Sequence, residues 1–111
     1  MYRKSDMNCE GVDAPPLAEK QKDFREKWEC LSKESTEFLL NSLEPRLVMS
    51  GHTHHGCLVY HKTKDSIPEY SVPSFSWRNR NNPSFMLVSF IKFSSIVMHV
   101  HNSLALLHFS D

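Results

Sequence analysis

The sequence lacks several features that define common classes of protein. None of its three cysteines forms a C-x-x-C pair, which argues against a cysteine-ligated zinc site. No run of Lys and Arg indicates nucleic-acid binding, and the 111 residues carry no formal net charge. The opening residues have no apolar stretch typical of a signal peptide. We therefore expect one small domain, or part of a larger one, without internal repeats.

The charged residues are unevenly distributed along the chain. Residues 1–45 carry seven basic and ten acidic side chains, whereas residues 46–111 carry six basic and three acidic ones. A basic second half suits an anionic ligand, and the plainer alternative is a solvated surface.

The first half of the sequence predicts a loop followed by helix. Residues 1–17 are polar and contain glycine and proline, and residues 18–44 are rich in helix-forming residues. A second helix is predicted to begin near Ser32, a good N-cap residue, and to end before Pro45. We expect its apolar face to be part of the core. That face consists of Phe38, Leu39, Leu40 and Leu43.

The second half predicts a series of short strands. They cover residues 46–50, 57–62, 69–72 and 85–90, with a turn at 62–66. Helix followed by strands is typical of an α/β or α+β domain. From residue 85 on the chain is apolar, but Lys92 and several histidines interrupt it, which disfavours a membrane-spanning helix. A buried or aggregation-prone tail is the favoured alternative.

The segment Ser50-Gly51-His52-Thr53-His54-His55-Gly56 is the strongest candidate for chemistry. Neutral imidazole is a common ligand of divalent metals, so His52 and His54 are candidate metal ligands. On a straight strand both would face one side, and on a glycine-hinged loop they would diverge toward two metals. The alternative is a polar turn. We interpret His55 as a solvent-facing neighbour and His61 as a surface histidine.

The segment 71–85 is a second candidate site. Arg78 and Arg80 offer forked donors that suit phosphate, or that support the fold. Trp77 and Phe75 are predicted either to stack on a sugar or to fill the core. Nearby amides at Asn79, Asn81 and Asn82 suit sugar hydroxyls or the fixing of the loop. The alternative is a long polar connection.

Two segments carry a resemblance to a known family. The run P-R-L-V-M-S-G-H-T-H at 45–54 resembles the last metal-binding motif of the calcineurin-like metallophosphoesterases. The run S-V-P-S-F-S-W-R-N-R-N-N-P-S-F at 71–85 is more specific, and resembles the branch of that family that remodels glycosylphosphatidylinositol (GPI) anchors. The resemblance covers roughly residues 2–87.

This resemblance implies the C-terminal part of a four-layer α-β-β-α fold with a two-metal centre. It implies a manganese-dependent phosphoesterase that removes ethanolamine phosphate from a mannose of the GPI anchor. That activity supports export of GPI-anchored proteins from endoplasmic reticulum exit sites to the Golgi, and implies membrane association. By the same resemblance His52 is a ligand of one metal and His54 a ligand of the other. Arg78 and Arg80, from their side-chain chemistry, are the candidate substrate-binding residues.

The sequence also departs from the family. The D-x-H, G-D-x-x-D and G-N-H-[DE] motifs are absent, and with them most metal ligands, including the bridging aspartate. We therefore predict that this chain alone has no hydrolase activity. The alternative is a non-catalytic product that binds a partner or a membrane surface.

The resemblance stops after Leu87, which divides the chain into a metallophosphoesterase part, 1–87, and a divergent apolar tail, 88–111. Val88-Ser89 can be encoded by GTAAGT, the consensus 5′ splice signal. One hypothesis is therefore that the tail is translated intron.

Overall fold

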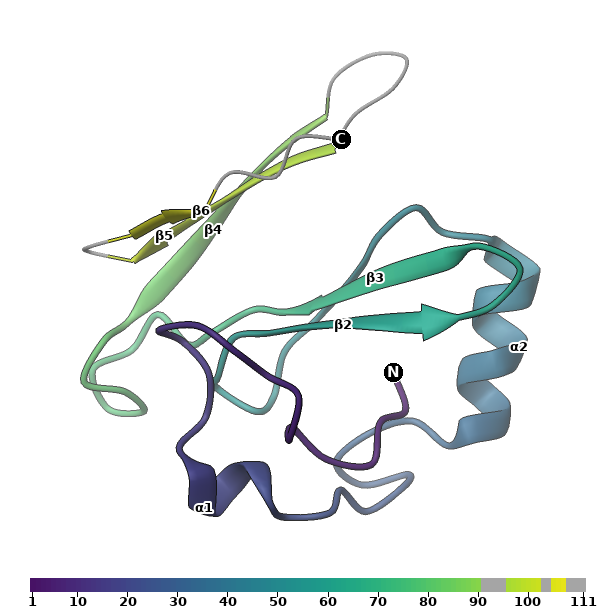
Figure 1. Cartoon of the computed structure of the whole chain (residues 1–111), viewed down its shortest axis with the longest axis horizontal. Helices are drawn as coiled ribbons and strands as arrows, with labels where there is room; N and C mark the ends of the chain where they lie inside the picture. Colours follow the sequence, from purple (N-terminus) through teal and green to yellow (C-terminus); the bar gives the residue numbers. More distant parts are fainter. Residues whose placement is uncertain (91–95, 103–104, 108–111) are drawn as a thin grey trace.

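The computed structural model describes the backbone of residues 1–90, 96–102 and 105–107, and the side chains up to residue 89. These described residues form two helices and six strands, arranged as shown in Figure 1. The helices are α1 (Leu17–Lys20) and α2 (Lys33–Leu43). The strands are β1 (Val48–Ser50), β2 (Cys57–Lys62), β3 (Ser66–Ser71), β4 (Ser84–Phe90), β5 (Ile96–Asn102) and β6 (Ala105–Leu107).

The first sheet has the strand order β1-β3-β2 and is mixed. β1 runs parallel to β3, and β2 runs antiparallel to it. Because β1 and β3 are parallel and Ser50 pairs with Ser71, the C-terminal ends of the two strands lie side by side. The histidine segment follows β1 at this end of the sheet, and the segment rich in Arg and Asn follows β3 there. Sheet topology thus brings together the two candidate segments.

Strand β3 begins earlier than the predicted 69–72, and it includes Pro68 in a central strand. Proline lacks the N–H that a central strand needs for pairing on both sides. Here β1 pairs only with residues 69–71 of β3, so Pro68 pairs with Tyr60 of β2 alone. At this residue β3 is locally an edge strand, which is the position that tolerates proline.

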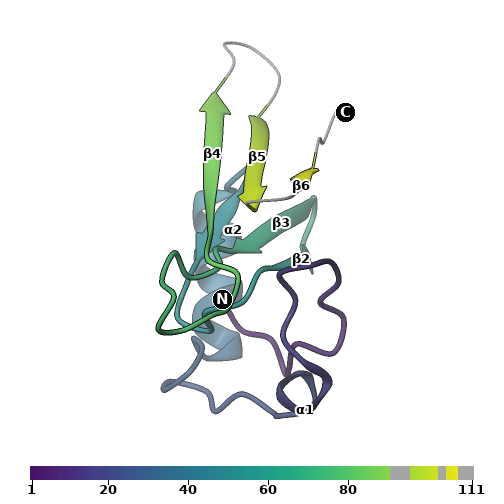
Figure 2. The ribbon, with the colours of Figure 1, turned by 90° about the vertical axis from the view of Figure 1, so that its left-hand side faces the viewer.

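The second sheet has the order β4-β5-β6 and is antiparallel throughout. Its strands project away from the rest of the chain, as Figures 1 and 2 show. β4 runs through Leu87 and Val88 without a break. Part of the predicted tail, residues 91–95, 103–104 and 108–111, lies outside the described residues. In the described part, no helix has the length and apolar character needed to cross a membrane.

Helix α2 matches its prediction and α1 does not. The Ser32 hydroxyl accepts a hydrogen bond from the Ser35 backbone N–H (3.2 Å), and α2 ends at Glu44 in a left-handed conformation just before Pro45. The prediction of helix is wrong for residues 21–31, because α1 stops at Lys20 and α2 begins only at Lys33. α1 buries no residue, and short helices need a packed face to be stable.

The apolar core is small. Among the side chains that the structure describes, five apolar ones are buried, namely Cys9, Leu40, Cys57, Ile67 and Tyr70. The predicted core face of α2 is only partly correct, since Leu40 is buried while Phe38 and Leu43 remain 70% and 69% exposed. Much of the interior is therefore polar. Its fully buried polar residues are Glu69, Ser71 and Ser84.

Glu69 is the buried charge at the centre of the first sheet. Its Oε1 accepts from the Met1 ammonium (2.8 Å), and its Oε2 lies 2.6 Å from His61 Nε2. Burial opposes ionisation, yet hydrogen bonds from the ammonium, Ser50 and His61 together hold the pKa of Glu69 below its usual value. The carboxylate thus stays charged inside the fold because it is surrounded by donors.

Candidate functional site

The histidine segment forms an exposed loop between β1 and β2. His52 and His54 are both exposed, and both have left-handed backbone conformations, with φ of 83° and 63°. Such values are uncommon in residues other than glycine and occur often at functional sites. His52 lines a cavity of about 180 Å³, whereas His54 is not part of its lining. The loop therefore presents the two rings in different surroundings.

The His52 cavity is rich in carboxylates. The acidic side chains in its lining are Asp6, Glu19, Asp23 and Glu29. The Arg25 backbone N–H donates to the carboxylate of Glu29 and lowers its pKa, and the nearby His52 acts in the same direction. His52 thus lies among anionic side chains.

A catalytic metal ion needs more protein ligands than the histidine loop supplies. In the part of the chain with described side chains, one group of three potential ligands lies within 4.8 Å, namely Asp6, Cys9 and Cys57. It is a poor metal site, because Cys9 and Cys57 form a disulfide and offer no thiolate. His52 and His54 have no third ligand in this part of the chain, and catalytic metals are usually held by at least three. The described residues therefore do not form a complete metal centre.

The disulfide holds the start of β2 to the N-terminal segment. Cys9 and Cys57 are 48 residues apart in sequence, and both are 1% exposed. Cys57 follows the histidine loop directly, so the bond fixes one end of that loop. The sequence allowed one disulfide but gave no reason to choose this pair, since Cys30, which is free, was an equal candidate.

Beneath the histidine loop lies a buried ion pair between Asp13 and Arg80. Arg80 Nη2 donates to Asp13 Oδ1 (2.8 Å), and the side chains of Arg80 and Asp13 are 7% and 8% exposed respectively. Arg80 Nη1 donates to the backbone oxygens of Asp13 (3.2 Å) and His54 (3.3 Å). The Ser84 hydroxyl donates to the same Asp13 carboxylate oxygen (2.9 Å). We call Asp13, Arg80 and Ser84 the clamp.

The clamp joins three segments that are distant in sequence. Asp13 belongs to the N-terminal loop, Arg80 lies in the connection between β3 and β4, and Ser84 is the first residue of β4. The histidine loop is attached by the Gly56 N–H, which donates to the Asp13 oxygen (2.9 Å), and by the Ser74 N–H, which donates to the His54 oxygen (3.0 Å). The position of His54 thus depends on residues far from it in the chain.

Gly56 has a steric role at this junction. A Cβ at this position would lie 2.7 Å from the Cβ of Asp13, which is too close for any side chain without movement. The hydroxyl of Tyr70 is the next nearest group, at 3.4 Å. Burial, together with the negative charge of Asp13, raises the pKa of Tyr70 to about 12, so this hydroxyl remains protonated.

The two predicted substrate-binding arginines have different surroundings. The guanidinium of Arg80 is occupied by Asp13 and by two backbone oxygens, which matches the alternative of fold support. Arg78 is exposed, and it contributes to the turn through its backbone N–H, which donates to Ser76 Oγ (3.3 Å). Of this pair, only Arg78 presents its side chain to solvent.

The predicted surface roles of two further histidines are wrong. His55 has a side chain only 18% exposed, and its Nε2 lies 2.9 Å from Glu19 Oε2. Its Nδ1 is buried and has no hydrogen-bond partner. His61, with a side chain 13% exposed, contacts the buried Glu69. The contact between His61 and Glu69 could have been inferred from the predicted turn at 62–66, because a hairpin at that turn brings the two residues near each other on adjacent strands.

Asp13 was missed as a site residue. It lies in a segment that sequence patterns indicate only as loop, and its partner Arg80 is 67 residues away. Exposure argues against one of the two alternatives for the aromatic residues: Trp77 is 75% and Phe75 is 73% exposed, so neither fills the core. Phe75 packs edge-on against Phe85, with ring centroids 5.7 Å apart.

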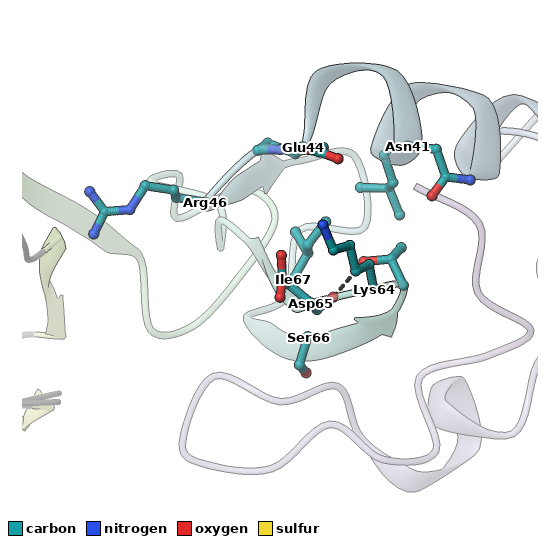
Figure 3. A pocket seen from close by; sticks show the side chains of 10 residues that line it. Asn41, Glu44, Arg46, Lys64, Asp65, Ser66 and Ile67 are labelled. Carbon is teal, nitrogen blue, oxygen red and sulfur yellow. Dashed lines mark hydrogen bonds between the residues drawn. The ribbon is translucent and has the colours of Figure 1, made fainter.

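A further cavity lies away from both candidate segments. A cavity of about 310 Å³ lies between the end of α2 and the turn that joins β2 to β3. Figure 3 shows Asn41 and Glu44 on the helix side and Lys64, Asp65 and Ser66 on the turn side. Charges of both signs surround it, and none of the candidate residues contributes to it.

Comparison with known proteins connects the two candidate segments to one family. Proteins named Metallophosphoesterase 1 from Macaca fascicularis, Cricetulus griseus and Gallus gallus are 55%, 56% and 55% identical to this chain over 89 residues. The match covers 80% of this chain. The matched part of this chain is homologous to metallophosphoesterase 1.

The match covers only part of each relative. The chain spans about a fifth of the length of these metallophosphoesterase 1 proteins, since the aligned segment makes up 22% of each. No protein-family model matches the chain. No solved structure matches it either. The homology therefore rests on sequence identity, and the structure independently confirms a small mixed α/β domain with a three-stranded mixed sheet and two helices.

Proposed function

We propose that this chain supplies the last metal-ligand loop of a two-metal phosphoesterase. His52 and His54 would each bind one of two divalent ions, with manganese as the expected metal. The observation that carries this proposal is the 55% identity to metallophosphoesterase 1, whose name describes a metal-using phosphoesterase. The exposed loop with left-handed conformations at both histidines is consistent with a ligand-binding role.

We further propose the substrate and cellular role that the sequence resemblance implies. The parent enzyme would remove ethanolamine phosphate from the mannose of GPI anchors and so support export of GPI-anchored proteins from endoplasmic reticulum exit sites to the Golgi. The disulfide between Cys9 and Cys57 supports such a location, because disulfides persist in oxidising compartments. Residues 1–87 would form part of the four-layer phosphoesterase fold. We propose that the divergent tail, 88–111, is intron-derived, which the genomic codons for Val88 and Ser89 would test.

The chain alone would have no hydrolase activity, because its described residues complete no metal centre. The test is hydrolysis of an activated phosphodiester by the purified chain with manganese. We expect no turnover above the metal-only rate. Turnover that His52→Ala abolishes would contradict this proposal.

Manganese binding can be tested separately from turnover. Mn²⁺ is paramagnetic, so substoichiometric addition should broaden the ring resonances of His52 and His54 in NMR spectra. His61 is a matched control, because its ring already contacts Glu69 inside the fold. Equal broadening of all three histidines would contradict a specific role for the loop.

A second candidate function is non-catalytic binding. The specific observation in its favour is exposed apolar surface, which includes Trp28, Phe38, Leu43 and Trp77. In the described part of the chain, β1 and β2 each also leave one edge of the first sheet unpaired. Size-exclusion chromatography over a range of concentrations would detect self-association, and a monomer at all concentrations would argue against the self-binding form of this alternative.

A further inference from the structure

The connection between β3 and β4 forms a cavity beside the histidine loop. The cavity has a volume of about 330 Å³ and is lined by the consecutive residues 77–82, with Ala14 and His55 on one side. It is separate from the carboxylate-rich cavity at His52, although His55 contributes to both.

The backbone of this cavity is fixed by hydrogen bonds. Ser76 accepts from the N–H groups of Asn79 and Arg80 (both 3.1 Å), which closes a turn under the cavity. The Asn79 side-chain amide donates to Ser74 Oγ (3.0 Å), and the Ser84 N–H donates to the Ser74 oxygen (3.2 Å). With Arg80 held in the clamp, the loop is formed before any ligand binds, which reduces the entropic cost of binding.

The fold does not use the side chains that this loop presents. Trp77 is 75% exposed, and Arg78 and Asn81 are also exposed. Trp28 offers a useful comparison: it is 81% exposed, but the Arg25 guanidinium lies over its ring at 5.6 Å. In the described part of the chain no cation covers the Trp77 ring, so its face is open to a ligand.

Charge selects the kind of ligand. The lining of this cavity includes the exposed Arg78 and no acidic side chain, and its second arginine, Arg80, is paired with Asp13. The His52 cavity, by contrast, includes four carboxylates. An anion is therefore favoured here and disfavoured there. A guanidinium binds phosphate in forked geometry, an indole face packs on the apolar side of a sugar ring, and amides bind hydroxyls.

We propose that this cavity binds a phosphorylated sugar. Trp77 stacks on the ring, Arg78 binds the phosphate, and the Asn79 side-chain oxygen and the Asn81 amide bind hydroxyl groups. Arg80 does not touch the ligand and acts as a positioning residue for the loop. This inference rests on the proposed function, because it assigns the place where the sugar and phosphate of that substrate bind.

The test uses the fluorescence of Trp77 in the full chain. A Trp28→Phe variant leaves Trp77 as the single tryptophan. The probe is mannose 6-phosphate, added in the presence of a chelator so that no metal takes part. We expect a saturable change in Trp77 emission, with mannose and inorganic phosphate each at least about tenfold weaker, since each lacks half of the contacts.

Variants assign the contacts. In the Trp28→Phe background, Arg78→Ala should weaken binding of mannose 6-phosphate by about tenfold, because it removes the charge-assisted hydrogen bond. Asn81→Ala should weaken binding less, because it removes only an amide. Both residues are exposed, so folding should be retained. Trp77→Phe, which keeps Trp28 as reporter, should show no emission change. Lys64→Ala, at the cavity of Figure 3, should bind as tightly as the unaltered chain.

Two sources of the ligand are separated by a second probe, the methyl phosphodiester of mannose 6-phosphate. Equal or tighter binding of the diester indicates a glycan phosphodiester, and tighter binding of the monoester indicates a free sugar phosphate. An unsaturable change, or inorganic phosphate bound as tightly as mannose 6-phosphate, would overturn the proposal. Because the titration is metal-free, its failure is distinguishable from a failure of manganese to reach His52 and His54.

Discussion

The clamp and the exposed residues His52, His54 and Arg78, which we call the rim, are built in opposite ways. Asp13 and Arg80 of the clamp are buried, paired and satisfied by several hydrogen bonds. The side chains of the rim are exposed to solvent. The three segments that meet at the clamp place the rim residues without restricting their side chains. The difference indicates that this part of the chain stabilises the loop through buried polar contacts and leaves its reactive groups open to a ligand.

The largest effect on stability should come from the clamp. Arg80→Ala leaves the Asp13 carboxylate buried and unpaired, and we expect a loss of about 3–5 kcal/mol in the free energy of unfolding. Arg78→Ala is the matched control, and should change it by no more than about 0.5 kcal/mol. Urea denaturation followed by circular dichroism measures both. Equal effects of the two substitutions would remove the distinction between clamp and rim.

The disulfide should have the next largest effect. Cys9 and Cys57 close a long loop, and replacing both with alanine should destabilise the fold by about 2–4 kcal/mol, mainly by freeing the unfolded chain. Cys30→Ala is the control, since this cysteine is free and should contribute little. A wild-type unfolding curve that does not respond to reductant would contradict the pairing.

Acid should reduce the contribution of the buried Glu69 carboxylate to the stability of the fold. Its pKa is lowered in the folded state, so its contribution to stability is present above the unfolded pKa and is lost as pH falls through the folded pKa. We expect the thermal midpoint of unfolding to fall when the pH drops below 4.5, the usual pKa of a glutamate side chain. Glu69→Gln should flatten this part of the pH profile. An unchanged slope in that variant would show that other carboxylates dominate.

The helix cap should give the smallest measurable loss. Ser32→Ala removes the side-chain acceptor for the Ser35 N–H and should cost about 1 kcal/mol. Ser42→Ala, at an exposed position within α2, is the control and should be close to neutral. If both substitutions have the same effect, the cap does not hold the start of α2.

Local elements were predictable from the sequence where the signal is local. Ser32 and Pro45 mark the ends of α2 because capping and proline geometry act within a few residues. The predicted strand 57–62 matches β2 in full. The segment 21–31 was wrongly predicted as helix because its composition favours helix, while Lys27 adopts a left-handed conformation (φ 67°) in a local turn.

Contacts between distant segments were not predictable in the same way. Nothing near Asp13 indicates a partner 67 residues away, and composition does not distinguish Arg80 from Arg78. The exposure of Phe38 and Leu43 also depends on what packs against α2, not on their spacing. The site residues could be proposed from motifs, but which of them bind a ligand and which support the loop depends on tertiary contacts.

The proposed role of this chain requires that His52 and His54 complete the metal centre of a phosphoesterase. The most direct measurement replaces the matching segment of a metallophosphoesterase 1 protein with residues 2–87 of this chain and follows manganese-dependent hydrolysis of a phosphodiester. We predict that the chimera is active, that His52→Ala and His54→Ala each remove nearly all activity, and that His61→Ala retains most of it. A folded chimera that hydrolyses the phosphodiester equally well without His52 and His54 would contradict the account.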